Sequence, residues 1–271
     1  MNIFKFELRQ NRKSIITWSA ALAVFVFIVM MATPMFMDSR GEMKKLLMGF
    51  PEAARNAMNI NIDTFFSYGA VGFYSYIFLY LGLISGIFAM YSGLNVFSKE
   101  KRMKTSDFLM SKPKNRAGIY RQKLLSVLVS FAVVDAVFFI ASYVSILLVS
   151  GGDLRITPYL LISFTFIFLQ IIFLSIGIFI ASVVSKIKSP VTFTMGVTFG
   201  TFLIGMIGAI IGMAGKSQVL RYFSPFRYFD NNYIMENNSY ELKFIIISAV
   251  IVTVLMAASF FIYVKRDIKA C

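Results

Sequence analysis

The sequence predicts an all-α integral membrane protein with six transmembrane helices. Hydrophobic residues make up 58% of its 271 residues, against about 45–50% in typical soluble domains, and the mean hydropathy is +0.74. Six apolar runs are long enough to cross a hydrocarbon core, which takes about 20 helical residues. These predicted spans are 15–37, 71–96, 126–149, 158–184, 190–214 and 244–264. We expect one membrane domain over residues 1–271, because the stretches between the spans are shorter than the roughly 50 residues of the smallest typical domains.

The distribution of basic residues predicts that both termini are cytoplasmic. Cytoplasmic loops are enriched in Lys and Arg, and an N-terminus on the inside puts 18 of the 27 Lys and Arg residues on that side. Acidic residues lean the other way, with eight of the 13 outside. Most of the net charge of +14 is therefore cytoplasmic. Two general causes explain most of this charge: the excess of basic residues that sets the orientation of membrane proteins, and attraction to anionic lipid headgroups.

The segment before the first span predicts an amphipathic helix at the membrane surface over residues 2–14. Apolar residues share one helical face and basic residues lie beside it, which is an interfacial pattern. These residues are Met1, Phe4 and Leu8, and Lys5, Arg9 and Arg12. We expect the first span to be an uncleaved membrane anchor, since its apolar run is too long for a signal peptide and no A-x-A-like cleavage site follows it.

Composition excludes several classes of site. The sequence has no His and one Cys, Cys271, which leaves no His-ligated metal site, His relay or thiolate cluster. The string GMAGKS at 212–217 resembles a phosphate-binding loop, but that motif needs a Gly where Ile210 stands. We therefore expect no catalytic residues, no metal and no nucleotide site in this chain.

The basic segment 98–123, SKEKRMKTSDFLMSKPKNRAGIYRQK, carries the most specific pattern. Thr105 or Ser106 predicts the N-cap of a short helix, an apolar patch follows, and Pro113 ends the helix. A second helix should start near Asn115 and run into the third span. A short amphipathic helix between helix-breaking residues is typical of a segment that binds either in a groove of a partner protein or on the lipid surface.

This segment resembles the signature E-x-x-x-G-T-L-x-x-L-L-x-x-P-x-x-R-x-x-I-x-x-x-K of ABC-2 type permeases, the membrane subunits of ABC transporters with the type V exporter fold. The matching residues are Glu100, Thr105, Phe108, Leu109, Met110, Ser111, Pro113, Arg116, Ile119 and Lys123. Lys104 stands where that family usually has Gly, and Lys enters the left-handed backbone region less freely. The order of six spans, the basic N-terminal segment, the turn at 185–190 and the outer segment 223–230 are similar to the family as well.

The resemblance implies a division of roles among several chains. Residues 105–112 would be a coupling helix seated in a cytoplasmic ATPase subunit, with Glu100 and Arg116 bracing it. The turn that holds Lys186 and Lys188 would make a second contact. Two ATPase copies would bind ATP and Mg²⁺, so this chain would need no cofactor of its own. A second permease, identical or homologous, would complete the path in a bacterial plasma membrane, in contact with lipids and without nucleic acid.

Asp135 is the only Asp, Glu, Lys or Arg residue inside the predicted spans. A charged carboxylate at mid-membrane costs at least about 2.5 kcal/mol on insertion scales, so it should face protein or water. Two hypotheses stay open. Asp135 contacts a cationic or amphiphilic substrate, or it has a structural place, either as a buried hydrogen-bonded group that holds the third span against its neighbours or near enough to a water cleft to stay ionised.

Small residues line one side of the second and fifth spans. Glycines three to five residues apart let helices approach closely, either within the subunit or at a seam between subunits. They are Gly82 and Gly86 in the second span, and Gly196, Gly200, Gly205, Gly208, Gly212 and Gly215 in the fifth. By the resemblance, these two spans line or flank the substrate path.

An aromatic-rich segment over 215–242 predicts an interfacial belt. The resemblance implies that it also dips into the outer leaflet as short helices that gate an exit. Its candidate exit residues are Phe223, Pro225, Phe226 and Phe229.

Together these patterns predict the permease of an ATP-driven exporter of an amphiphile, such as a peptide, a peptide antibiotic or toxin, a drug or a lipid. Two other classes stay open. A self-contained secondary carrier should show several intramembrane charges and an internal repeat. A membrane scaffold or sensor would bind an ATPase without moving a substrate.

Overall fold

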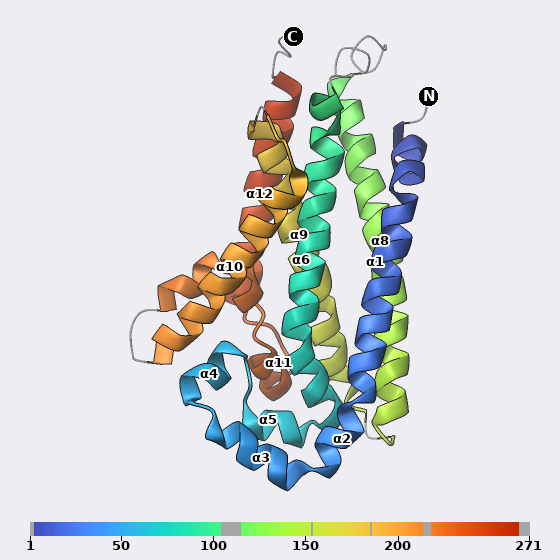
Figure 1. Cartoon of the computed structure of the whole chain (residues 1–271). Coiled ribbons are helices and arrows are strands. Elements are labelled where there is room, and N and C mark those ends of the chain that lie inside the picture. Colours follow the sequence, from blue (N-terminus) through green and yellow to red (C-terminus); the bar gives the residue numbers. More distant parts are fainter. Residues whose placement is uncertain (1–2, 104–114, 153, 185, 214–217, 266–271) are drawn as a thin grey trace.

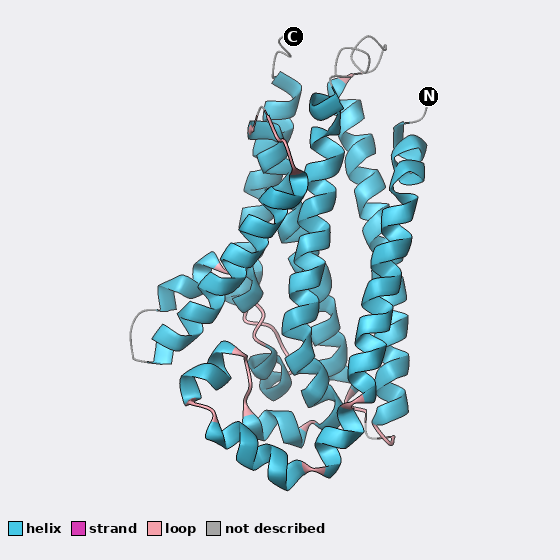
Figure 2. Ribbon diagram, in the orientation of Figure 1, coloured by secondary structure: helices cyan, strands magenta, loops and turns pink. Residues whose placement is uncertain are grey.

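The computed structural model describes residues 3–103, 115–152, 154–184, 186–213 and 218–265. Helices make up nearly all of this described part, and it holds no strand (Figure 2). Six long helices each contain a stretch that is long and apolar enough to cross a membrane, which confirms the predicted number of spans. They are α1 (Ile3–Met31), α6 (Gly69–Met103), α8 (Arg116–Val149), α9 (Ile156–Val183), α10 (Pro190–Met213) and α12 (Leu242–Lys265).

Several helices extend beyond the predicted spans. α6 continues through the charged residues that follow position 96 and ends at Met103, while α8 begins at Arg116. The predicted start near Asn115 is confirmed, since the Asn115 side chain accepts a hydrogen bond from the Ala117 amide at 3.1 Å. The predicted coupling helix, 105–112, lies outside the described residues.

The N-terminal segment is helical from Ile3 onward, and its place at the membrane surface stays a prediction. α1 runs from Ile3 to Met31 without a break, because this stretch contains no Pro or Gly to end a helix. Ile3 and Glu7 are buried against the protein. The segment thus continues directly into the first predicted span and packs part of one face on the protein.

The described part of the chain forms a bundle in which the start of α1 and the end of α12 lie at the same end (Figure 1). α6 lies against α9 and α1 lies against α8 along much of their lengths, whereas α10 is tilted away from the bundle axis (Figure 1). An even number of spans brings the two ends of a chain to one side of a membrane. We call this end, which also holds the last turn of α6 and the first turn of α8, the terminal end.

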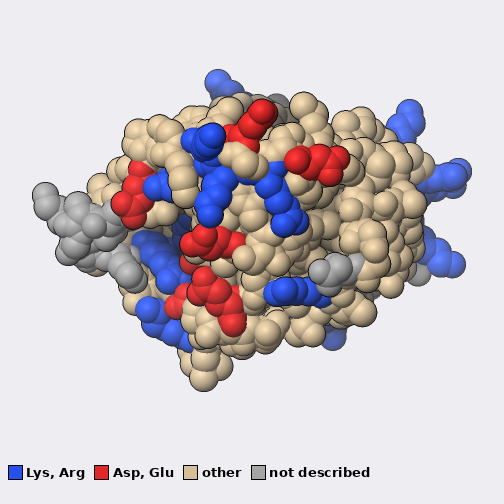
Figure 3. Space-filling model, turned by 90° about the horizontal axis from the view of Figure 1, so that it is seen from below, with Lys and Arg blue, Asp and Glu red and all other residues tan. Residues whose placement is uncertain are grey.

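Short helices gather at the opposite end (Figure 1). They are α2 (Thr33–Asp38), α3 (Arg40–Gly49), α4 (Glu52–Ala57), α5 (Ile62–Ser67), η1 (Gln218–Phe223), η2 (Pro225–Arg227) and α11 (Asn231–Asn237). Seen from this side, acidic and basic side chains lie together in one part of the face (Figure 3). We call this the distal end.

Glycines allow α6 to lie very close to α9. A Cβ atom added to Gly86 would lie 2.9 Å from the Phe173 ring, and one added to Gly82 would lie 3.1 Å from Leu169. Both distances are below ordinary van der Waals contact. Close backbone approach of this kind stabilises helix pairs in lipid, where helices gain little from hiding apolar surface. The glycines of the second span therefore serve packing within the subunit.

Candidate functional site

Three consecutive residues at the terminal end of α6 each reach a different neighbouring helix. Successive helical residues point about 100° apart, as 3.6 residues per turn requires, so such a triplet spreads over three directions. Lys99 reaches α1, Glu100 reaches α8, and Lys101 donates to the Ala181 carbonyl oxygen of α9 at 2.6 Å. We call this arrangement, with its partners Glu7, Gln10, Lys123 and Ala181, the α6 hub.

The Lys99 arm of the hub is a part-buried ion pair with α1. Its Nζ atom lies 2.6 Å from Glu7 Oε2 and 2.6 Å from Gln10 Oε1. Only 3% of the Glu7 side chain is exposed. Since an unpaired buried carboxylate is costly, Glu7 holds α1 to this point of α6.

The Glu100 arm binds a fully buried lysine. Lys123 has no exposed side-chain surface and donates to Glu100 Oε2 at 2.5 Å and to the Val96 carbonyl oxygen at 2.9 Å. Its Nζ atom also lies 5.7 Å from the centre of the Phe97 ring. The sequence pattern contained Lys123 but gave it no role, because sequence alone does not show that Glu100 of α6 lies beside it.

α12 joins the same end through Arg116 and aromatic rings. Arg116 Nη1 donates to the Val264 carbonyl oxygen at 3.3 Å, in the last turn of α12, where a cation is favoured. The rings of Tyr120 and Tyr263 lie 5.5 Å apart, and those of Phe97 and Tyr120 lie 5.1 Å apart. α6, α8 and α12 therefore meet in one polar and aromatic cluster.

The other residues predicted to contact an ATPase fall into two groups. Lys186 and Lys188 are exposed in the connection between α9 and α10, on either side of the buried Ile187. The remaining residues lie outside the described part of the chain; they are Thr105, Phe108, Leu109, Met110 and Pro113. The structure thus places Glu100 and Arg116 on the two helices that flank the undescribed segment 104–114.

The family comparison decides the class of protein. The model of a family described as ABC-2 family transporter protein matches residues 1–268. The chain belongs to the ABC-2 transporter family. Comparison with individual curated proteins gives no match. This ABC-2 permease is a multi-pass membrane component of an ABC transporter, and membership implies association with an ABC ATPase and often with a second permease.

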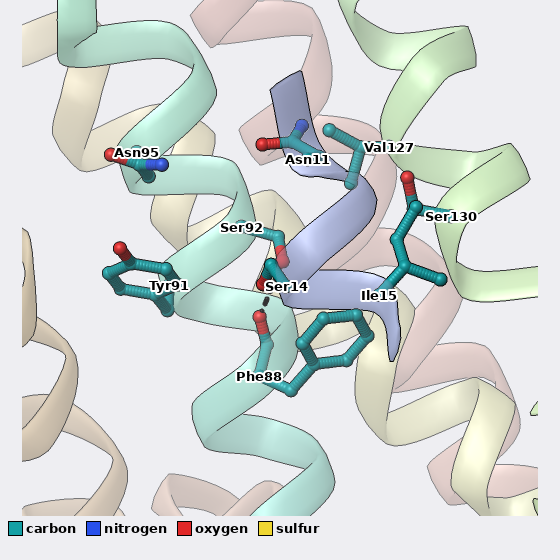
Figure 4. Close-up of a pocket in the computed structure, with 9 residues that line it drawn as sticks. All are labelled: Asn11, Ser14, Ile15, Phe88, Tyr91, Ser92, Asn95, Val127 and Ser130. Atoms are coloured by element: carbon teal, nitrogen blue, oxygen red, sulfur yellow. Dashed lines mark hydrogen bonds between the residues drawn. The ribbon is translucent and has the colours of Figure 1, made fainter. Parts of the chain in front are cut away.

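A small polar cavity lies beside the hub, where α1, α6 and α8 meet (Figure 4). Its volume is about 10 Å³, room for about one water molecule. Its lining residues are Asn11, Ser14, Ile15, Phe88, Tyr91, Ser92, Asn95, Val127 and Ser130. This cavity is too small for an amphiphilic substrate of the permease.

Asp135 lies inside the bundle of the permease and is bonded to a neutral partner. Gln170 of α9 donates from Nε2 to Asp135 Oδ1 at 2.7 Å, and 7% of Asp135 is exposed. Nearer the distal end, Ser142 of α8 is hydrogen-bonded to Tyr159 of α9 at 2.9 Å. These contacts match the hypothesis that Asp135 holds α8 against its neighbours. Gln170 was missed because sequence alone does not tell which side of α9 faces α8.

The glycine stripe of α10 divides into two environments. A Cβ atom on Gly208 would lie 2.9 Å from Leu220 Cβ, and one on Gly205 would collide with Ser224. Gly196 and Gly200 have no other atom within 4 Å of such a position. Gly205 and Gly208 therefore pack against η1 and its neighbours in the same chain, while Gly196 and Gly200 face outward.

The predicted exit residues also differ from one another in how far they are exposed. Phe226 and Phe229 are buried, whereas 63% of Phe223 is exposed. Phe226 lies 4.9 Å from the Phe173 ring and Phe229 stacks on Phe168 at 5.1 Å, both on α9. Pro225 is buried at the start of η2. Phe226 and Phe229 are therefore packed into the bundle, and only the exposed part of the segment fits the predicted interfacial belt.

Arg227 fixes this segment to α4, a link that the sequence did not suggest. Its guanidinium donates to Asn59 Oδ1 at 3.2 Å and to the carbonyl oxygens of Asn56 and Ala57, in a helix end where carbonyls lack intrahelical partners. Burial lowers the pKa of Arg227, and the nearby Asp230 carboxylate partly offsets this. The short helices of the distal end are thus held together by a side chain bonded to backbone.

Proposed function

We propose that this permease is the membrane subunit of an ATP-driven exporter that moves an amphiphilic substrate out of a bacterial cell. Candidate substrates are peptides, peptide antibiotics or toxins, drugs and lipids. Two copies of a separate cytoplasmic ATPase bind ATP and Mg²⁺ and hydrolyse the ATP. A second permease, identical or homologous, completes the path. The chain itself supplies no catalytic residue, metal or cofactor.

The α6 hub is the observation that carries this proposal. The undescribed segment 104–114 follows α6 and precedes α8, so any force on it reaches both helices through the backbone. Lys99, Glu100 and Lys101 then join α6 to α1, α8 and α9 in the last turns of α6 before that segment. Rigid-body coupling between distant sites requires a stiff connection, and these contacts supply one.

Charge supports a cytoplasmic location of the terminal end. The stretches of sequence at or next to the helix ends on this side are 1–14, 98–123, 185–190 and 265–271, and together they hold 18 of the 27 Lys and Arg residues. Positive residues favour the cytoplasmic side, where an ATPase has access to ATP. A reporter that is active only outside the cell should therefore be silent when fused after Cys271, and strong activity would contradict this topology.

Isolation of the tagged permease in mild detergent tests the function. We expect an ABC-type ATPase to co-purify, and its hydrolysis in the reconstituted complex to rise with some members of a panel of amphipathic peptides. Phe108→Ala should release the ATPase, since losing an aromatic anchor from an interface can cost about 2 kcal/mol or more. Arg116→Glu should leave the ATPase bound but abolish peptide stimulation, because it breaks the contact with α12.

Lys114→Ala is the control variant, because it changes a basic residue of the same segment outside the predicted helix. It should behave as the unchanged protein in both assays. If Phe108→Ala and Arg116→Glu match this control, the segment 104–114 rests on lipid and the ATPase-coupled function is wrong. If the ATPase binds but no substrate in any class raises its hydrolysis, the permease is a scaffold or sensor.

A further inference from the structure

A second and larger cavity lies at the distal end. Its volume is about 370 Å³, within the range of about 300–1,000 Å³ typical of small-molecule sites. α4, α10, η1, η2 and α11 or their adjoining residues contribute to its walls. The proposed export function assigns no ligand to it.

Three charged residues, Arg221, Arg227 and Asp230, line this cavity; Arg227 and Asp230 are near each other, but neither lies within ion-pair distance of an opposite charge among the described residues. Arg221 is neutralised by its ion pair with Glu241. Arg227, in contrast, donates only to the neutral oxygens of Asn56, Ala57 and Asn59 among the described contacts. Asp230 accepts from the Asn232 amide at 3.0 Å and lies in no ion pair of the described chain. The wall therefore offers one cation and one anion to a ligand.

The rest of the wall is amide-rich on one side and apolar on the other. Asn56, Asn59 and Asn232 contribute polar side chains, and Phe226 and Phe229 contribute rings. A ligand with a small dipolar group fits this lining better than a purely anionic or purely apolar one. An anion alone would be repelled by Asp230, and an apolar group would leave the charges without partners.

The cavity adjoins a surface of α10 that faces away from the protein. Gly208 and Ala209 line the cavity, while Ile204, Ile207 and Ile211 on the same helix are exposed. Residues four apart are neighbours on a helix surface, so Ile204 lies beside Gly208. In a span, exposed isoleucines of this kind contact lipid tails.

We propose that this cavity binds the headgroup of a zwitterionic phospholipid of the surrounding bilayer. The lipid phosphate is placed at Arg227 and its ammonium group at Asp230. Its acyl chains lie along the isoleucine face of α10. This site is a property of the permease alone and holds whether or not the export function is correct.

Native mass spectrometry of the full chain, released from nanodiscs, tests the site. In discs of equal parts phosphatidylethanolamine and phosphatidylglycerol, we expect one phosphatidylethanolamine to stay bound per chain. Asp230→Asn keeps an oxygen for the Asn232 amide but removes the charge. Since hydrogen bonds to charged groups contribute about 1.5–3 kcal/mol and 1.4 kcal/mol is tenfold in affinity, retention should fall about tenfold or more.

Two further variants separate the cavity from the general lipid surface. Ala209→Phe fills the cavity and should abolish retention, whereas Ile207→Phe changes the lipid-facing side of the same helix and should not. Equal retention of both lipids, or unchanged retention in Asp230→Asn and Ala209→Phe, would overturn the proposal. Inorganic phosphate at millimolar concentration should not displace the lipid, because it offers no ammonium to Asp230; displacement by phosphate would show a simple anion site instead.

Discussion

The two ends of the bundle are held together by different kinds of contact. At the terminal end, charged side chains join long helices to one another, and α6 takes part in the contacts to α1, α8 and α9. At the distal end, Arg227 and Arg221 join short helices and loops to one another. Charged contacts at the terminal end therefore join several spans, while the arginine contacts of the distal end join short helices and loops, and aromatic rings such as Phe226 pack that end on α9.

This difference predicts that changes at the terminal end alter the whole bundle. Lys123→Met should have the largest effect, a loss of about 3–5 kcal/mol in stability, because it leaves Glu100 without its buried partner. Thermal unfolding in detergent measures it, with exposed Arg121→Met as the control. The double variant with Glu100→Met should recover much of the loss, since a buried ion pair replaced by apolar groups is often neutral. No recovery would show that the pair is not the cause.

Changes at the distal end should stay local. Arg227→Met removes hydrogen bonds from a charged group to the end of α4, each typically about 1.5–3 kcal/mol. Amide hydrogen exchange should rise at residues 52–60 and stay unchanged in α6 and α8 near the hub. Arg40→Met, at an exposed position of α3, is the control. Faster exchange at the hub would mean that the two ends are not independent.

The glycines of α10 offer a matched pair. Gly208→Leu should cost about 1–3 kcal/mol by overpacking against Leu220. Gly200→Leu adds the same side chain where no atom lies within 4 Å, so the stability of the single chain should change by no more than about 0.5 kcal/mol. Denaturation of the monomer compares the two. A loss of assembly or transport in Gly200→Leu at unchanged stability would place Gly200 at a seam between permeases.

The smallest effect is expected at Asp135. Asp135→Asn keeps the oxygen that accepts from Gln170, so stability should change by less than about 1 kcal/mol. Transport of uncharged substrates should be unaffected. A selective loss of transport of cationic substrates would instead support a role for Asp135 in the substrate path.

The sequence predicted the spans well and their ends poorly. Hydropathy finds apolar runs, so the six helices were predictable, but it stops at charged residues such as Lys99 and Glu100. These residues continue α6 because Lys and Glu are good helix formers, and their charges find partners on other helices. Gln170 and Arg227 were missed for a related reason. Their partners, Asp135 and the end of α4, are distant in sequence, and only the packed bundle brings them together.

Equal spacing of glycines also proved insufficient to predict their roles. Gly82 with Gly86 and Gly196 with Gly200 are each four residues apart. The first pair packs against α9, whereas the second faces outward. Helix periodicity tells which residues share a face, and the neighbours of that face are decided by the rotation of the helix in the bundle.

The central claim is that the α6 hub transmits the ATPase signal to the bundle. Substrate-stimulated ATP hydrolysis of the reconstituted complex tests it most directly, with Glu100→Gln as the variant and Glu52→Gln at the distal end as the control. Glu100→Gln keeps the side-chain shape but weakens the bond to Lys123, so we expect the ATPase to stay bound with normal basal hydrolysis and to lose most of its response to substrate. A full response in Glu100→Gln, with Phe108→Ala still releasing the ATPase, would contradict the claim.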